Sequence, residues 1–507
     1  MAEPFDSYKK LRNQIAELDF EGSFAAAWAF SQYTQVKNFR FPDDVEKHAS
    51  FSSTGYVQPF PWQLETIMRE VVLHAADASR RDKSLKRWNT MSSIINSLRR
   101  LEDVIHEPIL GPDNVLLELL RISHQQFPWQ RNPTTRMVGR YYWIFKDAKI
   151  DEICRKLTGL SIDKIYAMGL GLWGLLTSKA FFPLPMQVDA SIAITREEFE
   201  SFFALCSTEV YEFRQIIKAG QRLDDTYAYD NRFLRASPLI RFRKAGRDFM
   251  ACPLPTLLYW RFTSGLYYDL TAEPDFFNAL GASFQGYVGE VFRRALEGKN
   301  LKCQAEEKYG PKGKPKDTVD WIILDSDAAL FLECKSKRLS LSAKTNLVSR
   351  DALNKDIGIL ADAICQTYRT IEEYKADRYP SLRYDANRKI YPVIVTLENW
   401  YPLGLGVTAE LDKQLKVKLA AANISENVLV EMPYSVASCD EIEELAQIVA
   451  QTGLAKFFDG KSAEKYRGWM IEGYIADAFK TERDATVDLF AETFDQILQP
   501  VRAVMPT

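Results

Sequence analysis

One segment, residues 318–335, restricts the possible folds more than any other part of the chain. It contains two apolar runs, Thr318–Leu324 and Ala328–Cys334, joined by Asp325-Ser-Asp327. Short β-rich runs on either side of a tight polar turn predict a hairpin. Because both runs are apolar at consecutive positions, each strand would be buried on both faces, which requires helices above and below the sheet. The segment therefore predicts an α/β core.

The surrounding pattern predicts how the chain is organised. Apolar residues at helical spacing make residues 1–235 mostly helical, and the runs within Leu239–Pro255 indicate a hairpin. We therefore expect a helical N-terminal region at 1–235, an α/β domain at 236–452 and a short helical tail at 453–507. The elements expected in the second domain are helices at Phe276–Leu296 and Ala352–Tyr374 and strands at Leu301–Tyr309, Lys389–Leu397 and Asn427–Met432.

Charged residues end the two strands of the hairpin. Alternate residues of a strand share a face, so Glu333 and Lys335 project together, and the hairpin can bring Asp320 beside them. Two carboxylates at the end of an apolar hairpin are costly to desolvate unless they are paired or bind a metal. Oxygen ligands of this kind suit Mg²⁺ or Mn²⁺, and the lysine could orient a water molecule and stabilise developing charge. This pattern predicts a metal-dependent hydrolytic site.

These residues resemble the PD-(D/E)XK nuclease superfamily, with Thr318-Val-Asp320 and Glu333-Cys-Lys335 as its motif. The resemblance covers about residues 275–435 and implies a restriction-endonuclease-like core with a mixed sheet flanked by helices. It implies that Asp320, Glu333 and the backbone carbonyl of Cys334 bind the metal while Lys335 positions the attacking water. It further implies roles for Glu290, as a metal ligand or its neighbour, and for Gln366, as a contact to substrate or lysine; a solvated helix position is the alternative for each.

Local charge agrees with a polyanionic substrate. The whole chain has a net charge of −3, but residues 299–350 contain 11 basic and 7 acidic residues. Such basic clusters can neutralise phosphates, although a solvated loop is the simpler explanation for residues 309–316. The residues expected to contact nucleic acid, DNA rather than RNA, are Lys312, Lys314, Lys316, Lys337 and Arg338.

Histidine and cysteine exclude other chemistry. The four histidines all precede residue 125, so a site in the last 383 residues cannot use histidine as base or ligand. Seven scattered cysteines without a CxxC pair fit reduced thiols in a cytoplasm and give no zinc signature. The longest apolar run, Ile165–Leu176, is too short to cross a bilayer, so no membrane partner is expected.

Three further patterns in the sequence resemble binding motifs. Gly169–Gly174 matches GxGxxG, with Asp189 about 20 residues on, but it reads as part of one apolar helix. The stretches 80–88 and 127–146 interleave aromatic and basic residues, as a nucleic-acid surface would; a solvated helix face and a half-buried aromatic turn are the simpler explanation.

The sequence thus predicts a Mg²⁺- or Mn²⁺-dependent endonuclease. By analogy it would act in defence against foreign nucleic acid, with a regulatory or motor partner protein and possible homo-oligomers. Two alternatives stay open: a catalytically silent nucleic-acid-binding or scaffolding protein on the same fold, and an RNA-cleaving toxin.

Overall fold

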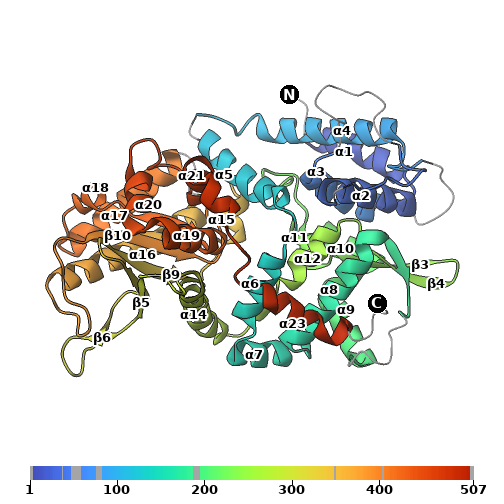
Figure 1. Cartoon of the computed structure of the whole chain (residues 1–507). Helices are drawn as coiled ribbons and strands as arrows, with labels where there is room; N and C mark the ends of the chain where they lie inside the picture. Colours follow the sequence, from blue (N-terminus) through green and yellow to red (C-terminus); the bar gives the residue numbers. More distant parts are fainter. Residues whose placement is uncertain are drawn as a thin grey trace.

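The computed structural model describes residues 4–36, 38–46, 59–75, 83–112, 114–186, 194–347, 350–401 and 405–502. Helices of the N-terminal part gather at one end of the molecule, and a five-stranded sheet with its covering helices forms the other (Figure 1). In the described part, no helix combines the length and the apolar character that crossing a bilayer requires.

The N-terminal part is mostly helical, as predicted. Its core is built from one face of each amphipathic helix, for example Leu11, Phe24 and Leu98. Its elements are α1 (Pro4–Ala16), α2 (Phe20–Gln35), α3 (Pro61–His74), α4 (Trp88–His106), α5 (Val115–Gln126), the 3₁₀ helix Phe127–Gln130, α6 (Thr135–Phe145), α7 (Ala148–Thr158), α8 (Ile162–Ser178), β1 (Phe181–Pro183), α9 (Arg196–Cys206), β2 (Ser207–Glu209), α10 (Val210–Gly220) and α11 (Arg232–Ala236).

The GxGxxG match lies inside α8, in agreement with the single apolar helix expected there. Gly169 permits a close helix contact, because a Cβ atom at this position would lie 2.4 Å from the ring of Phe262. The glycine therefore serves packing. Asp189, which would complete the dinucleotide pattern, lies outside the described residues, as do residues 80–82 of the first basic stretch.

The predicted hairpin at Leu239–Pro255 is confirmed as β3 (Leu239–Lys244) and β4 (Arg247–Ala251). Its turn residues, Ala245 and Gly246, have φ angles of 48° and 80°, as a tight hairpin turn requires. β1 pairs with β4 and β2 pairs with β3, so this hairpin is the centre of a four-stranded sheet. The sheet joins strands from both sides of the expected boundary at residue 235.

The second sheet has five strands in the order β11-β10-β9-β8-β5. β5, β8 and β9 form an antiparallel meander, and β10 runs parallel to both β9 and β11. The elements from here onward are α12 (Pro255–Phe262), α13 (Leu266–Leu270), α14 (Phe276–Ala295), β5 (Lys302–Ala305), β6 (Lys308–Tyr309), β7 (Lys316–Asp317), β8 (Trp321–Leu324), β9 (Ala328–Lys335), α15 (Leu341–Thr345), α16 (Asp351–Lys375), β10 (Lys389–Thr396), α17 (Leu405–Ala421), α18 (Val428–Glu431), β11 (Ser435–Ser438) and α19 (Cys439–Thr452).

Helices cover both faces of this sheet, as the doubly apolar strands predict. Leu330 and Leu332 of β9 share one core with Phe284 of α14, whereas Phe331 packs in another core with Ile364 of α16. α16 connects β9 to the parallel strand β10, which gives the mixed α/β arrangement expected from the sequence.

The expectation of a strand at Asn427–Met432 is wrong. Residues 428–431 form the single helical turn α18, and the strand beside β10 is Ser435–Ser438. The apolar residues Val-Leu-Val at 428–430 do not form a buried strand, since Val430 is 68% exposed and only Val428 is buried. Pairing with β10 places the strand after the turn, where Ser438 also begins α19 as its N-cap.

The tail is helical, as predicted, and returns to the N-terminal part. It consists of α20 (Leu454–Ser462), α21 (Ile471–Ala478), α22 (Lys480–Asp484) and α23 (Ala491–Arg502). α23, red in Figure 1, packs against α6 and α8. The first and last parts of the chain are therefore held together by direct helix contacts.

A close contact between α14 and β8 fixes the position of the meander. Trp321 donates its indole N–H to the carbonyl oxygen of Gln285 (2.8 Å), and a Cβ atom at Gly289 would lie 2.0 Å from the Trp321 ring. We expect Gly289→Ala to lower the free energy of unfolding by about 1–3 kcal/mol, because the ring must move. Urea denaturation measures the change.

Gly281→Ala on the same helix is the matched control. A Cβ atom there meets its nearest neighbour at 3.9 Å, an ordinary contact. We expect this variant to be neutral or up to about 1 kcal/mol more stable, because alanine is the better helix former. Equal effects of the two substitutions would contradict the packing assigned to Gly289.

Candidate functional site

The hairpin brings Asp320 and Glu333 together at one edge of the five-stranded sheet. Trp321 of β8 is paired with Leu332 of β9, so the residue before Trp321 lies opposite the residue after Leu332. The backbone N–H of Cys334 donates to Oδ2 of Asp320 at 2.6 Å. At the other end, the Asp325 carboxylate accepts the N–H groups of Asp327 and Ala328, which closes the turn and sets this register.

Glu333 is an incompletely satisfied buried carboxylate. The residue is 3% exposed, and its Oε1 accepts a hydrogen bond from Nζ of Lys335 at 2.7 Å. Its Oε2 is buried without a hydrogen-bond partner. An orphaned buried carboxylate oxygen is costly, and a metal ion is one of the few groups that can offset that cost.

Both carboxyl groups of the site, Asp320 and Glu333, have raised pKa values. Burial, reinforced by the negative charge of Asp320, raises the pKa of Glu333 to about 7, while Lys335 opposes the shift. Burial also raises the pKa of Asp320, although the hydrogen bond from Cys334 acts in the opposite direction. Such a pair favours a cation between the two groups.

Glu306 is a third acidic residue, not predicted from the sequence, and its negative charge acts on both Asp320 and Glu333. It follows β5, and its backbone N–H donates to the carbonyl oxygen of Asp320 at 2.9 Å. Its negative charge contributes to the raised pKa of Asp320 and of Glu333. Its side chain accepts a hydrogen bond from Gln285 of α14 at 3.2 Å. The signal available in the sequence was its place at the end of the strand that begins the meander.

Glu290 and Gln366 have other surroundings in the structure. The Glu290 carboxylate pairs with Arg293 and Arg294 of its own helix, and the Arg293 hydrogen bond is the main cause that lowers its pKa to about 2. The described contacts of Glu290 do not join it to Asp320 or Glu333. Gln366 is exposed on α16.

The five basic residues expected to contact nucleic acid fall into two groups. Lys312 and Lys314 are exposed on the loop between β6 and β7, and the exposed Lys316 pairs with Glu373 at 2.7 Å. Lys337 lies 3.8 Å from Asp356. Arg338 pairs with Glu398 at 2.8 Å and donates to the carbonyl oxygen of Ser264, and its side chain is only 11% exposed, so its guanidinium is held within the protein.

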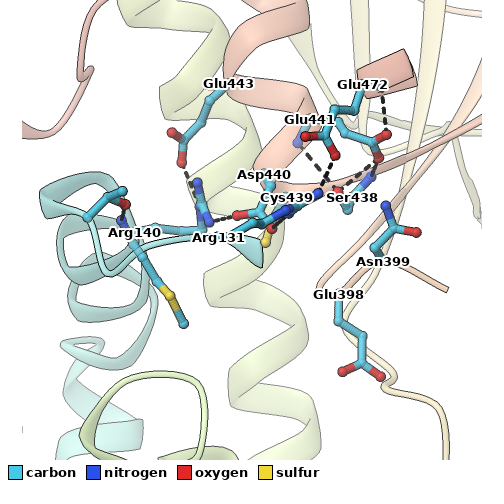
Figure 2. Close-up of polar contacts among 12 residues, drawn as sticks. Arg131, Arg140, Glu398, Asn399, Ser438, Cys439, Asp440, Glu441, Glu443 and Glu472 are labelled. Atoms are coloured by element: carbon cyan, nitrogen blue, oxygen red, sulfur yellow. Dashed lines mark hydrogen bonds and ion pairs between the residues drawn. The ribbon is translucent and has the colours of Figure 1, made fainter. Parts of the chain in front are cut away.

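A second polar region lies where α6 meets α19 (Figure 2). Arg131 pairs with Asp440 at 2.8 Å and with Glu472 of α21, and Arg140 pairs with Glu443 at 2.7 Å. These ion pairs connect the stretch 127–146 to the C-terminal part. Its arginines 131 and 140 therefore hold the two parts together.

The described residues contain no cluster of three or more histidine, cysteine, aspartate or glutamate side chains spaced to hold a metal. Mg²⁺ commonly takes only one or two carboxylates, completing its shell with water and phosphate oxygens. Asp320 and Glu333 fit that smaller donor set, and the orphaned Oε2 of Glu333 is an oxygen that such an ion would use.

No protein-family model, curated protein or solved structure was found to match the chain.

The raised pKa of Glu333 has a consequence for stability. A carboxyl group whose pKa is higher in the folded state contributes stability below its unfolded value, near 4.5, and loses it as pH rises through about 7. We expect Glu333→Gln, in EDTA, to raise the free energy of unfolding by about 1–3 kcal/mol at pH 8 and by little at pH 5.

Urea denaturation of wild type and variant at both pH values is the measurement. Glu373→Gln provides the control, because burial raises the pKa of that half-buried carboxylate less than its ion pairs with Lys316 and Arg378 lower it, so its pKa is lowered. If Glu333→Gln were destabilised equally at both pH values, the ionised form of Glu333 would not be disfavoured in the folded protein.

Proposed function

We propose that this protein is a metal-dependent nuclease that hydrolyses phosphodiester bonds, with DNA as the expected substrate. The observation that carries the proposal is the carboxylate pair: Asp320 and buried Glu333 meet at the sheet edge, and one oxygen of Glu333 lacks a partner. The order of the meander, the crossover helix α16 and the parallel strand β10 supports the resemblance to the PD-(D/E)XK superfamily.

Asp320 and Glu333, with the backbone carbonyl of Cys334, would hold Mg²⁺ or Mn²⁺. Such an ion supplies Lewis acidity toward a phosphate oxygen and toward water. Asp320 is held in place by the N–H of Cys334, so its free oxygen atom is oriented before any ligand arrives. This preorganisation reduces the cost of assembling the site.

Lys335 would act on water and on phosphate charge. Its Nζ lies 2.7 Å from Oε1 of Glu333, and its side chain is 28% exposed, so it reaches both the buried carboxylate and solvent. An ammonium group there can orient the attacking water and stabilise the negative charge that develops on the phosphate. Glu306 adds negative charge at the same edge and would strengthen cation binding.

A cleavage assay tests the proposal. Plasmid, linear and single-stranded DNA and RNA are incubated with the full chain in Mg²⁺ or Mn²⁺, with EDTA as the blank. We expect cutting that requires metal and that falls by about 100-fold or more in Asp320→Ala and Lys335→Ala.

Lys375→Ala is the matched control, because Glu373-Tyr-Lys375 repeats the acidic-x-lysine spacing within helix α16. That variant should cut like wild type. Cleavage retained in Lys335→Ala, or lost equally in Lys375→Ala, would refute the assigned roles. Cutting of RNA alone would change the proposed substrate from DNA to RNA and leave the proposed metal site unchanged.

A further inference from the structure

Residues 308–317, called the arm below, form a short exposed ribbon just before the metal-binding hairpin. β6 and β7 pair antiparallel, with Lys308 opposite Asp317. Residues 310–315 between the two strands are all exposed, and the arm lies far from the N-terminal helices α1–α4 (Figure 1). A Cβ atom added at Gly313 would meet no atom within 4 Å, so the tip of the arm stands in open space.

The base of the arm is fixed beside the proposed metal site. Tyr309 is buried, and its ring centre lies 5.2 Å from that of Tyr379. The buried Thr318 follows the arm. Its N–H donates to the carbonyl oxygen of Glu307 at 3.1 Å, and its hydroxyl accepts the N–H of Glu307 at 3.0 Å. Asp320 comes two residues after Thr318. These contacts set where the arm begins relative to the carboxylate pair.

The arm has an excess of unpaired positive charge. It contains four lysines and one acidic residue, Asp317. Lys316 pairs with Glu373 at 2.7 Å. The ammonium groups of the other three have no ion-pair or hydrogen-bond partner among the described residues: Lys308, Lys312 and Lys314. Three unpaired lysines minus Asp317 leave an excess of two positive charges on the arm.

The carboxylates that contact the base of the arm or adjoin it are already engaged. Glu373 serves two cations, Lys316 at 2.7 Å and Arg378 at 2.6 Å. The Glu307 carboxylate accepts hydrogen bonds from the hydroxyl and the backbone N–H of Ser381, at 2.6 and 3.3 Å. The three unpaired lysines are therefore available to an anionic partner from solvent.

The composition of the arm suits phosphates of a duplex better than the bases of a single strand. Its one aromatic ring, Tyr309, is buried, whereas proteins that bind single strands stack bases on exposed rings. Each lysine–phosphate contact also gains more from counterion release on duplex DNA, with a salt slope of about 0.9 against about 0.7 on a single strand. A two-stranded ribbon fits the B-form major groove, but the A-form groove is deep and narrow.

We propose that the arm binds the phosphates of duplex DNA next to the bond that is cut, without reading the base sequence. The inference rests on the proposed nuclease function and names the form of its substrate. Of the five basic residues predicted to contact nucleic acid, three are ion-paired, namely Lys316, Lys337 and Arg338. Lys312 and Lys314 keep that role, and Lys308 joins them.

Binding measured without cleavage tests the inference. A labelled DNA duplex is titrated with the full chain in EDTA at several NaCl concentrations, and fluorescence anisotropy gives Kd. We expect the triple variant Lys308→Gln/Lys312→Gln/Lys314→Gln to bind about tenfold or more weakly at low salt. The slope of log Kd against log salt concentration should fall by about 2–3, because three phosphate contacts are lost.

Lys9→Gln/Lys10→Gln/Lys149→Gln is the matched control. It removes three exposed lysines of the N-terminal part whose ammonium groups also lack a partner among the described residues, so both triple variants change the net charge equally. The control should keep the wild-type affinity and slope. Equal weakening in the two variants would overturn the inference, because any three lysines would then serve. Thermal unfolding confirms that each variant is folded.

Other nucleic acids test the choice of duplex DNA. An unpaired single strand and an RNA duplex of the same length should each bind more weakly than the DNA duplex, and the arm variant should lose most of that preference. Equal weakening of single-strand binding in the arm variant would overturn the assignment to a duplex. An RNA duplex bound as tightly as the DNA duplex would overturn the choice of DNA.

Cleavage kinetics separate this inference from the proposed function. The arm variant should raise KM more than it lowers kcat, because the arm binds substrate and does not touch the reacting phosphate. Unchanged binding in the arm variant, with metal-dependent cleavage by wild type, would refute the arm alone. Arm-dependent binding without any cleavage by wild type would refute the proposed nuclease activity and leave the arm as a DNA-binding element.

Discussion

The contact on which the proposed chemistry depends is the hydrogen bond from the backbone N–H of Cys334 to Asp320. It joins the ends of β8 and β9 at 2.6 Å, and with the Asp325 turn at the other end it fixes which residues face each other. A shift of one residue would move Glu333 to the other face of the sheet and separate it from Asp320. The register of one hairpin therefore decides whether a two-carboxylate site exists.

The remaining structure supports that register from both faces. Trp321 is held against α14 by its bond to Gln285, and Phe331 packs in the core that includes α16. The buried strand leaves Glu333 little water, which raises its pKa and leaves one oxygen without a partner. A buried carboxylate oxygen without a partner lowers the stability of the fold. Binding sites commonly contain such destabilising groups, because the ligand supplies the missing interaction.

Local pattern predicted what depends on neighbouring residues in the chain. The hairpin, its turn and the shared face of Glu333 and Lys335 all follow from alternation and turn chemistry within eighteen residues. The strand Ser435–Ser438 was not predicted, because its own residues are only weakly apolar. Its pairing with β10 makes it a strand. The environment of Arg338 could not be predicted either, since its partner Glu398 is sixty residues away in the chain.

Manganese titration by calorimetry on the wild-type chain and on Asp320→Ala and Glu333→Gln tests whether the two carboxylates form a metal site. We expect Mn²⁺ to bind wild type and to bind each variant at least about tenfold more weakly, while Glu290→Gln shows how far that helix carboxylate takes part. Equal Mn²⁺ affinity in wild type and in both Asp320→Ala and Glu333→Gln would show that the two carboxylates do not form a metal site.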